Sequence, residues 1–347
     1  MSGTSLDGVD LAYCLFEKVD SGWNFSVPLA VTYAYPDEWK RIFESLPCSS
    51  GCELTETDVK YGNYLGSLVN RFIEQYNLKP DFISSHGHTI FHRPDKGYTL
   101  QIGNGASIAA RTGETVICDF RATDVALLGQ GAPLVPAGDK ILFGKFGYCL
   151  NLGGFANISY DQDNKRIAFD ICPVNIVLNR LSMQLGFPFD KDGDNSSKGM
   201  IDNDLLTNLN RIDYYHSAPP KSLGREWFEN VFLPVLDHSN ADIYSKLRTV
   251  TEHIAFQIST STMNGNGHDI LITGGGAHNL FLIGRIKSLV QKKLCIPDDK
   301  TIDFKEALVF AFLGVLRSRN EINCLASVTG ATRDSICGTI YAGDSLK

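Results

Sequence analysis

Three glycine-rich turns supply the residue types that bind phosphate groups. They are Ser2-Gly3-Thr4-Ser5, Leu152-Gly153-Gly154-Phe155 and Thr273-Gly274-Gly275-Gly276-Ala277. Glycine lets the backbone come close to a phosphate, and the N–H groups of the turn can then donate to it. None of the turns has the spacing of a Walker P-loop or of a dinucleotide-binding GxGxxG turn. A single turn is explained by tight turning alone. Three in this order predict two turns on β- and γ-phosphates and a third, opening a helix, under adenosine and the α-phosphate.

The composition limits the class of protein that carries these turns. The chain has 347 residues, of which 43% are hydrophobic and 20% charged, with a net charge of −7. This is typical of a globular protein of about two domains. An acidic chain without a block of Lys and Arg is a poor candidate for general binding to nucleic acid or to anionic membranes. No apolar stretch reaches the roughly 18 residues of a membrane span, and no signal-peptide pattern is present. The sequence therefore predicts a cytoplasmic protein.

Nine cysteines are scattered along the chain, several of them in apolar runs such as VICDF and GYCLNL. This distribution is typical of buried free thiols in a reducing compartment. The nearest pair, Cys48 and Cys52, has no second pair and no histidine at zinc spacing. A metal or redox site at this pair is therefore disfavoured.

Each half of the chain has strand-rich stretches followed by helical ones. VDLAYCLFEKV and WNFSVPLAVTYAYP predict two strands joined by a polar turn, and a helix is expected from about Glu56. The stretch DFRATDVALLGQGAPLVPAGD predicts a long polar, glycine-rich loop. From residue 143 the pattern restarts with GYCLNLGGFANISYD and RIAFDICPVN as adjacent strands. We therefore predict two similar α/β domains, residues 1–142 and 143–347, that face each other across a cleft.

Several strings along nearly the whole chain resemble the 1,6-anhydro-N-acetylmuramic acid kinase family of the actin, hexokinase and Hsp70 ATPase superfamily. The most specific are MSGTSLDG and GQGAPLVP, and the others are SSHGHTIFHRP, TLQIGNGASIAARTG, DFRATDVALL, LNLGGFANIS, FDICPVN, FDKDG, PKSLGRE, TGGGAHN and VTGATR. The resemblance implies two actin/ribonuclease H-like domains around a nucleotide and sugar cleft, ATP and Mg²⁺ as cofactors, and a homodimer. It also implies a hydrophobic half-strand before MSGTS, which predicts a native N-terminus upstream of Met1.

The family reaction opens the 1,6-anhydro bridge with water while O6 of the sugar receives the γ-phosphate of ATP. The product is N-acetylmuramic acid 6-phosphate, an intermediate of peptidoglycan recycling. This reaction needs a base for the water, donors for the sugar, and Mg²⁺ to neutralise phosphate charge. Asp170, at the end of an apolar strand, matches the family's general base. The alternatives for Asp170 are a helix N-cap and a structural hydrogen bond.

The resemblance also implies a set of sugar-binding residues. Asn175 follows Asp170 in the same motif and is predicted to orient the sugar or the base. His86, Arg121 and Asp124 match the sugar side of the first domain. A guanidinium such as that of Arg121 suits the lactyl carboxylate because it can form paired hydrogen bonds. The alternative for Arg121 is a salt bridge to Asp119 or Asp124.

Glu306, predicted at the start of the last helix, matches a family residue near the sugar. Its alternative is a first-turn Glu favoured by the helix dipole. His88 and His92 are predicted to be structural or surface residues. In the nucleotide site, Asp7 or Asp10 is predicted to hold Mg²⁺ through water, with a turn-forming Asp as the alternative for each. The predicted nucleotide contacts are Gly3, Thr4, Ser5, Leu6, Asp7, Gly8, Val9, Asp10, Gly153, Gly154, Asn157, Gly274, Gly275 and Gly276.

Three stretches depart from the family pattern, and we predict that they cluster on the sugar side. Ile171–Val174 replaces a Thr or Cys followed by Gly-Pro-Gly, Asn179 replaces a carboxylate, and Ala137-Gly138-Asp139 follows GQGAPLVP. The departures fit either the same sugar or a shifted one. Asp139 lies in a Gly-Asp context that resembles the base of glycerol-kinase-like members, so it is a second candidate base. Two other functions stay open from the sequence. One is a kinase for another sugar or small acid, and the other is a non-catalytic nucleotide or sugar sensor.

Overall fold

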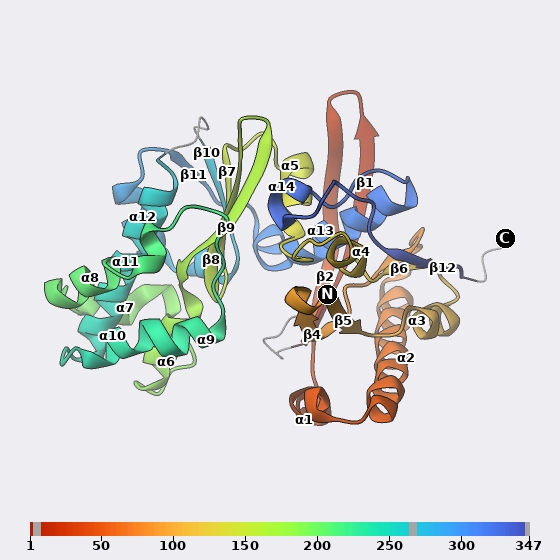
Figure 1. Ribbon diagram of the computed structural model, residues 1–347, viewed down its shortest axis with the longest axis horizontal. Coiled ribbons are helices and arrows are strands. Elements are labelled where there is room, and N and C mark those ends of the chain that lie inside the picture. Colours follow the sequence, from red (N-terminus) through yellow and green to blue (C-terminus); the bar gives the residue numbers. More distant parts are fainter. Residues whose placement is uncertain (3–7, 264–268, 344–347) are drawn as a thin grey trace. The chain divides into compact units, whose positions relative to one another are not determined.

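The chain folds into two α/β units (Figure 1), and the computed structural model describes residues 1–2, 8–263 and 269–343. Unit 1 comprises Met1–Leu142 and Phe304–Lys347, and unit 2 comprises Phe143–Asp303. The sequence predicted a second domain of residues 143–347, whereas the structure assigns residues 304–347 to unit 1. The reason lies in α13 (Asp299–Ser318), which departs from helical geometry at Phe304.

Beyond Phe304, the chain contributes to the core of unit 1. Val309, Phe310 and Leu313 of α13 are buried in one cluster with Ile117 and Phe120. The strand β12 (Thr339–Tyr341) pairs with β6 (Val116–Cys118), which also pairs with β3 (Ile83–Ser84). Hydrophobic burial and a strand pairing therefore both hold the C-terminal part of the chain in unit 1.

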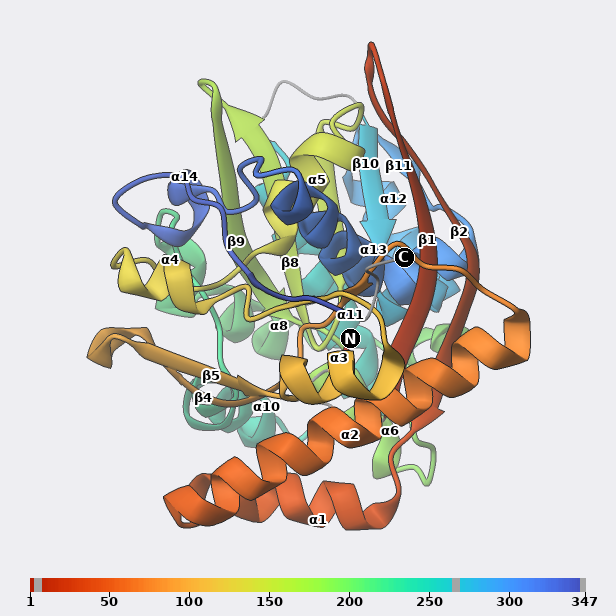
Figure 2. The same cartoon turned by 90° about the vertical axis from the view of Figure 1, so that its right-hand side faces the viewer.

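Unit 1 begins with a long antiparallel hairpin, β1 (Gly8–Val19) and β2 (Gly22–Ala34), in register from Gly8 opposite Ala34 to Val19 opposite Gly22. Figure 2 shows this hairpin together with the long helix α2 (Gly51–Tyr76). The helix α3 (Gly105–Thr112) lies beside α2 in both views. A second hairpin joins β4 (His88–Arg93) to β5 (Tyr98–Ile102), and α1 (Asp37–Ser45) follows β2.

Two helices lie in the stretch for which the sequence predicted a long loop. They are α4 (Ala122–Ala126) and α5 (Val135–Leu142). Val125, Ala137 and Leu142 are buried. Helix formation here gives hydrogen-bond partners to backbone groups that would otherwise be buried without them. This requirement outweighs the low helix propensity of the glycine and proline residues in the stretch.

Unit 2 is built on a five-stranded sheet in the order β11-β10-β7-β8-β9. The strands β7 (Tyr148–Leu152), β8 (Phe155–Gln162) and β9 (Lys165–Pro173) form an antiparallel meander. The strands β10 (Asp269–Thr273) and β11 (Lys293–Cys295) continue the sheet in parallel, beside β7. This order, with three antiparallel strands followed by two parallel ones, is the ribonuclease H-like arrangement that was predicted.

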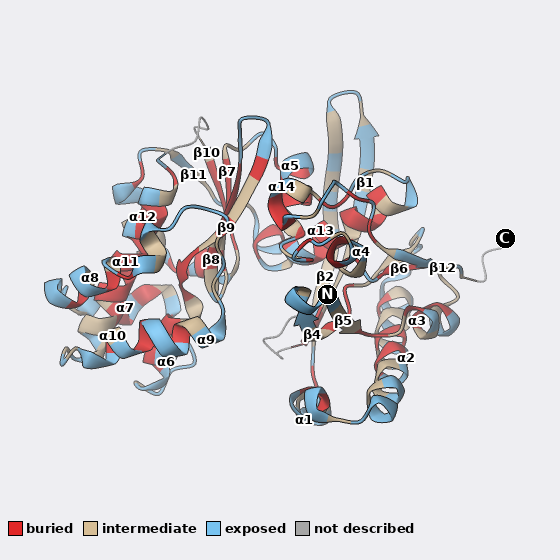
Figure 3. Cartoon of the chain, viewed as in Figure 1, coloured by how far each residue is buried: buried red, intermediate tan, exposed pale blue. Residues whose placement is uncertain are grey.

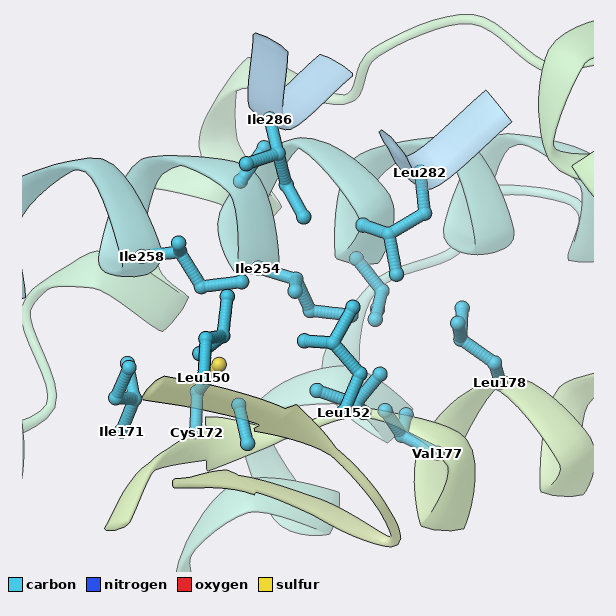
Figure 4. Close-up of a cluster of buried hydrophobic side chains, with 14 of the residues drawn as sticks. Leu150, Leu152, Ile171, Cys172, Val177, Leu178, Ile254, Ile258, Leu282 and Ile286 are labelled. Carbon is cyan, nitrogen blue, oxygen red and sulfur yellow. The ribbon is translucent and has the colours of Figure 1, made fainter. Parts of the chain in front are cut away.

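Helices cover the sheet of unit 2 and bury its apolar side chains. Figure 4 shows Ile254 and Ile258 of α11 (Ile243–Ser261) facing Leu150 and Leu152 of β7. Side chains of α12 (Leu280–Leu289) and α6 (Asn175–Met183) join the same cluster. Burial of each such side chain contributes about 1.5–3 kcal/mol. Figure 3 shows the buried inner faces and exposed outer faces of these helices.

No disulfide joins the cysteines, all nine of which lie in the described ranges, and five of them are buried. Within residues 1–2, 8–263 and 269–343, no helix combines the length and the apolar character needed to cross a membrane. The remaining elements are η1 (Leu46–Cys48), η2 (Pro94–Lys96), η3 (Lys191–Gly193), α7 (Asp194–Lys198), α8 (Asn203–Asn210), η4 (Asp213–His216), α9 (Arg225–Trp227), η5 (Phe228–Phe232), α10 (Leu233–His238), η6 (Gly275–His278) and α14 (Ala326–Thr329).

Candidate active site

The predicted base, Asp170, lies beside an irregularity in the edge strand β9. Asn157 of β8 is opposite Asp170, and Ala156 is opposite Cys172, so Ile171 has no partner of its own. Such a β-bulge bends the strand and redirects side chains, and bulges are common beside active sites. The side chain of Ile171 is buried and that of Asp170 is half-buried. The departure from the family pattern at Ile171 therefore falls on the bulge residue.

The two oxygens of the Asp170 carboxyl have different surroundings. Oδ2 accepts a hydrogen bond of 2.8 Å from the backbone N–H of Leu223, whereas Oδ1 has no donor among the residues that the structure describes. Burial raises the pKa of this carboxyl above the ordinary 3.8, and the Leu223 N–H opposes that rise. A carboxylate with one oxygen fixed and the other open can accept a proton.

The N-cap alternative for Asp170 is wrong. The helix that follows, α6, has Val174 at its N-cap position and no side-chain cap. A structural hydrogen bond does exist, but it occupies only one carboxyl oxygen. Asp170 is thus both anchored and chemically available.

The first glycine turn of unit 2 is tied to the start of α6. The carbonyl of Gly153 accepts from the N–H of Asn175, and the carbonyl of Gly154 accepts from Val174 and Ile176. A Cβ on Gly154 would meet nothing within 4 Å. The turn therefore has an anchored carbonyl side and an open side, as a phosphate-binding turn requires.

The second glycine turn of unit 2 has two positions where a side chain would not fit. Gly274 has a φ of +83°, and a Cβ on it would lie 2.5 Å from Oδ1 of Asn151. A Cβ on Gly276 would lie 2.8 Å from Cβ of Leu152. The turn leads into the short η6, and α12 begins only at Leu280 after its N-cap Asn279. The turn predicted to open a helix therefore runs first into the short η6 and then into α12.

A pocket of about 430 Å³ lies in unit 2 beside this turn. Leu178 and Phe189 give it apolar walls, and Asn175 and Asn179 supply amide groups. This volume and mixed lining suit a small organic ligand such as a purine nucleoside. The sequence predicted Asn175 and Asn179 on the sugar side, but the structure brings both into the pocket of the predicted adenosine turn. The full lining is Asn175, Leu178, Asn179, Phe189, Asp190, Lys191, Asp192, Gly275, Gly276, His278 and Asn279.

Sequence reasoning did not single out Phe189, which lines this pocket. It is 54% exposed in a polar loop, and an exposed aromatic ring beside a pocket is a natural platform for a planar base. The signal in the sequence was the pair of phenylalanines in FPFDKDG, which are large apolar residues in an otherwise polar loop.

The structure brings together His86 and Arg121 in unit 1. Nε and Nη2 of Arg121 lie 3.0 and 2.9 Å from Nε2 of His86, and Nδ1 of His86 lies 2.9 Å from the carbonyl of Gly87. Because arginine only donates, Nε2 accepts and the proton of the neutral ring is on Nδ1. Burial and the Arg121 charge lower the pKa of His86 to about 3. The imidazole is therefore an uncharged acceptor for Arg121.

Arg121 and Asp124 hold the GQGAP segment from both sides. Nη1 of Arg121 donates to the carbonyl of Gly131 at 2.7 Å, and Oδ2 of Asp124 accepts from the N–H of Gly131 at 2.7 Å. Oδ1 of Asp124, which is fully buried, accepts from the Thr329 hydroxyl at 2.7 Å. No ion pair joins Arg121 to Asp119 or Asp124, all of which are described, so the salt-bridge alternative is wrong. The observed contacts give these side chains a structural role; their predicted contact with the sugar stays a prediction.

Glu306 and Lys305 lie just beyond the bend in α13. Glu306 is the eighth residue of this helix, so it is not in the first turn, although it closely follows the bend at Phe304. Desolvation raises the pKa of its carboxyl, and Arg121 opposes that rise. Lys305 forms a buried ion pair of 2.8 Å with Asp139 of α5. This pairing accounts for the burial of Asp139 and weakens its standing as the second candidate base.

Only part of the first predicted nucleotide segment is described. Gly8, Val9 and Asp10 begin β1, and Oδ1 of Asp10 accepts from the Thr32 hydroxyl at 2.6 Å. A Cβ on Gly8 would lie 2.5 Å from the carbonyl oxygen of Tyr33, so the strands require glycine there. The predicted contacts Gly3, Thr4, Ser5, Leu6 and Asp7 lie outside the described residues.

No group of three or more His, Cys, Asp or Glu side chains that could hold a metal occurs in the described ranges. Mg²⁺ in a nucleotide site takes most of its ligands from phosphates and water and needs only one or two carboxylates. A single carboxylate such as that of Asp10 is compatible with this kind of ion.

The histidines predicted to be structural have ordinary protein contacts. Nδ1 of His88 lies 2.9 Å from Oγ of Ser2, and Nδ1 of His92 lies 3.0 Å from the Thr99 hydroxyl. His88 is buried and stacks on Phe43. These contacts are consistent with a structural role.

Comparison with known proteins gives full-length matches. The model of the family "Anhydro-N-acetylmuramic acid kinase" matches residues 1–343. Anhydro-N-acetylmuramic acid kinase of Sulfurovum sp. is 34% identical and covers 98% of this chain and 97% of its own. The protein of that name from Clostridioides difficile is 36% identical, with 98% and 96% covered. A solved ROK family glucokinase from Streptomyces griseus, in complex with glucose and AMPPNP, is 10% identical with a TM-score of 0.37, with 86% and 97% covered.

Proposed function

Because the chain belongs to the anhydro-N-acetylmuramic acid kinase family, we propose that it converts 1,6-anhydro-N-acetylmuramic acid, ATP and water into N-acetylmuramic acid 6-phosphate and ADP. The observation that carries this proposal beyond the family name is the half-buried Asp170, with one carboxyl oxygen anchored and the other open. Such a group suits the activation of a water molecule.

In the proposed reaction, Oδ1 of Asp170 takes a proton from water while the water oxygen bonds to C1 of the sugar. The C1–O6 bond of the anhydro bridge then breaks, and O6 takes the γ-phosphoryl group as ADP leaves. The raised pKa of Asp170 helps because a stronger base accepts the water proton more readily. The N–H of Leu223 keeps the carboxylate oriented during the transfer.

The nucleotide is proposed to bind through backbone groups and a mixed pocket. Gly153 and Gly154 would donate to phosphate, and Gly275 and Gly276 would lie under the nucleoside beside Phe189. Asp10 would hold Mg²⁺ through water, and the ion would neutralise charge on the transferred phosphate. Asn157, opposite Asp170 on the neighbouring strand, would lie at the junction of base and phosphate.

For the sugar, we propose a role for the guanidinium of Arg121 and for Glu306. Arg121 is fixed by His86 and Gly131, so its orientation is set before substrate binds. The side chain of Glu306 is exposed, so its carboxyl is available for a hydrogen bond to a sugar hydroxyl. Homodimer formation, a cytoplasmic location and a place in peptidoglycan recycling are further parts of the proposal that rest on the family resemblance.

The deciding experiment mixes the protein with Mg-ATP and 1,6-anhydro-N-acetylmuramic acid in water enriched in ¹⁸O. The expected product gains one phosphate and one water, with the label on C1, at the rate of ADP release. A gain of phosphate alone would identify a kinase acting on an ordinary hydroxyl. Nucleotide binding without sugar-dependent ADP release would identify a sensor. Either of these results contradicts the proposal.

A further inference from the structure

The strand that carries Asp170 needs hydrogen-bond partners at its outer edge. β9 is the last strand of its sheet and pairs only with β8. An edge strand leaves N–H and C=O groups without a neighbouring strand, and proteins commonly cover such groups with a loop. At Asp170 the covering segment is Tyr214–Leu223, which follows in the same unit.

Three contacts from this segment converge on the single residue Asp170. The hydroxyl of Tyr214 donates to the Asp170 carbonyl at 2.6 Å. The N–H of Asp170 donates to the carbonyl of Lys221 at 3.2 Å. The N–H of Leu223 donates to Oδ2 of the side chain at 2.8 Å. Main chain and side chain of Asp170 are thus fixed from the same segment.

The segment is itself braced by Lys221. Its Nζ donates to the carbonyl of Tyr214 at 3.0 Å and lies over the ring of Tyr214 at 4.7 Å and that of Phe169 at 5.6 Å. Cation–π contacts of this kind are attractive, and the attraction is stronger when the cation is partly desolvated. Lys221 therefore connects the two ends of the segment to the strand residue that precedes Asp170.

We propose that Tyr214–Leu223 is the positioning element for the catalytic carboxylate, with the Tyr214 hydroxyl setting the main chain of Asp170 and the Leu223 amide setting Oδ2. This inference rests on the proposed function, which makes Asp170 the base. The bulge at Ile171 turns the side chain, and the segment then holds it, leaving Oδ1 as the proton acceptor. Tyr214 and Leu223 are positioning residues, since they act through Asp170.

The titratable groups around Asp170 do not offer another explanation of what holds its carboxylate in place. Burial raises the pKa values of the Tyr214, Tyr215 and Cys172 side chains, so these groups are uncharged near neutral pH. Burial lowers the pKa of His253 to about 3, so that ring is neutral as well. Lys221 is a cation in this neighbourhood, and its Nζ donates to the carbonyl of Tyr214.

The test uses the full chain and two backbone variants. Leucic acid, the α-hydroxy analogue of leucine, replaces Leu223 and removes its N–H; the resulting ester also weakens the carbonyl of Ser222, which accepts from no described residue. The matched control places lactic acid at the exposed Ala218, where neither the lost N–H nor the weakened carbonyl of Ser217 bonds to a described residue. The pKa of Asp170 is read by NMR from ¹³Cγ-labelled aspartate, with the signal identified by its loss in Asp170→Asn. A hydrogen bond to the charged form lowers a carboxyl pKa, so the Leu223 ester is expected to raise the pKa of Asp170 and the Ala218 ester to leave it unchanged.

A third variant, Tyr214→Phe, removes the hydroxyl and keeps the ring. We expect kcat to fall about tenfold, since small displacements of a reacting group are costly, while both KM values stay within twofold. Equal Asp170 titrations in the two esters would overturn the proposal, as would a Tyr214→Phe kcat within twofold of the parent. If the parent releases no sugar-dependent ADP, the proposed function fails, and the NMR titration still decides the positioning role.

Discussion

Asp170 in unit 2 and Asp124 in unit 1 both accept a backbone N–H, but their second oxygens differ. Oδ1 of Asp124 is taken up by the Thr329 hydroxyl, and the side chain is fully buried. Oδ1 of Asp170 has no donor among the described residues, and the side chain reaches solvent in part. Both were predicted site residues. The comparison shows that the hydrogen bonding of the second carboxyl oxygen distinguishes a carboxylate that holds a loop from one that is available for chemistry.

The largest effect is expected when the open oxygen of Asp170 loses its basicity. Asp170→Asn keeps the shape and an acceptor for Leu223 but cannot take a proton. We expect kcat to fall about 10²- to 10⁴-fold, the usual contribution of a general base, with ATP affinity retained. Sugar-dependent ADP release and calorimetric ATP titration measure the two quantities. A kcat within tenfold of the parent contradicts the role of base.

For Asp124 the comparison predicts a loss of stability. Oδ1 and Oδ2 of Asp124 accept from the Gly131 N–H, the Thr329 hydroxyl and the Cys324 thiol. Asp124→Asn leaves one oxygen acceptor and no charge, so these buried hydrogen bonds are weakened or rearranged. We expect the free energy of unfolding to fall by about 1–3 kcal/mol, as measured by urea denaturation. The matched control is Asp95→Asn, whose only described partner is the exposed Arg93, with a change within about 0.5 kcal/mol. An unchanged stability with a raised sugar KM would assign Asp124 to substrate contact.

The nucleotide site proposed at the glycine turns of unit 2 can be tested separately from the two aspartates, because the proposed contacts need the backbone to approach the ligand. In Gly276→Ala the new Cβ would crowd Leu152, and the displaced turn is expected to weaken ATP binding about tenfold. Gly284→Ala on α12 meets nothing within 4 Å, so it is expected to keep ATP affinity and to gain up to about 1 kcal/mol of stability. Equal ATP affinities in the two variants would remove this turn from the nucleotide site.

The smallest effect is the stability cost of keeping Asp170 ionised. Its pKa is raised in the folded protein, so the folded state holds the proton to higher pH than the unfolded state does. Its contribution to stability therefore falls as pH rises from 3.8 through the folded-state pKa. Asp170→Asn is expected to have a slightly higher melting temperature than the parent at pH 7 and an equal one below pH 3.8. A lower melting temperature at pH 7 would indicate that the charge stabilises unit 2.

Local patterns predicted much of the fold. Alternation predicted the β1–β2 hairpin, and the restart near residue 143 coincides with a unit boundary. The start of α2 was placed five residues late because the capping box of Ser50 and Glu53 was overlooked. Contacts distant in sequence were not predictable in this way. The Asp170–Leu223 bond spans 53 residues and the Asp124–Thr329 bond 205, so only the folded chain shows which aspartate keeps an open oxygen.

The division of the chain also sets an order of events during synthesis. Unit 2 is one continuous segment, Phe143–Asp303, whereas unit 1 is made from both ends of the chain. Because translation adds about 5–20 residues per second, synthesis of unit 2 ends a few seconds before the second half of α13 and the strand β12 have both been made. Until those residues emerge, β6 lacks its partner β12, and the cluster around Ile117 and Phe120 lacks Val309 and Phe310. The part of unit 1 that is translated first therefore needs residues from beyond unit 2 before its sheet and its core are complete.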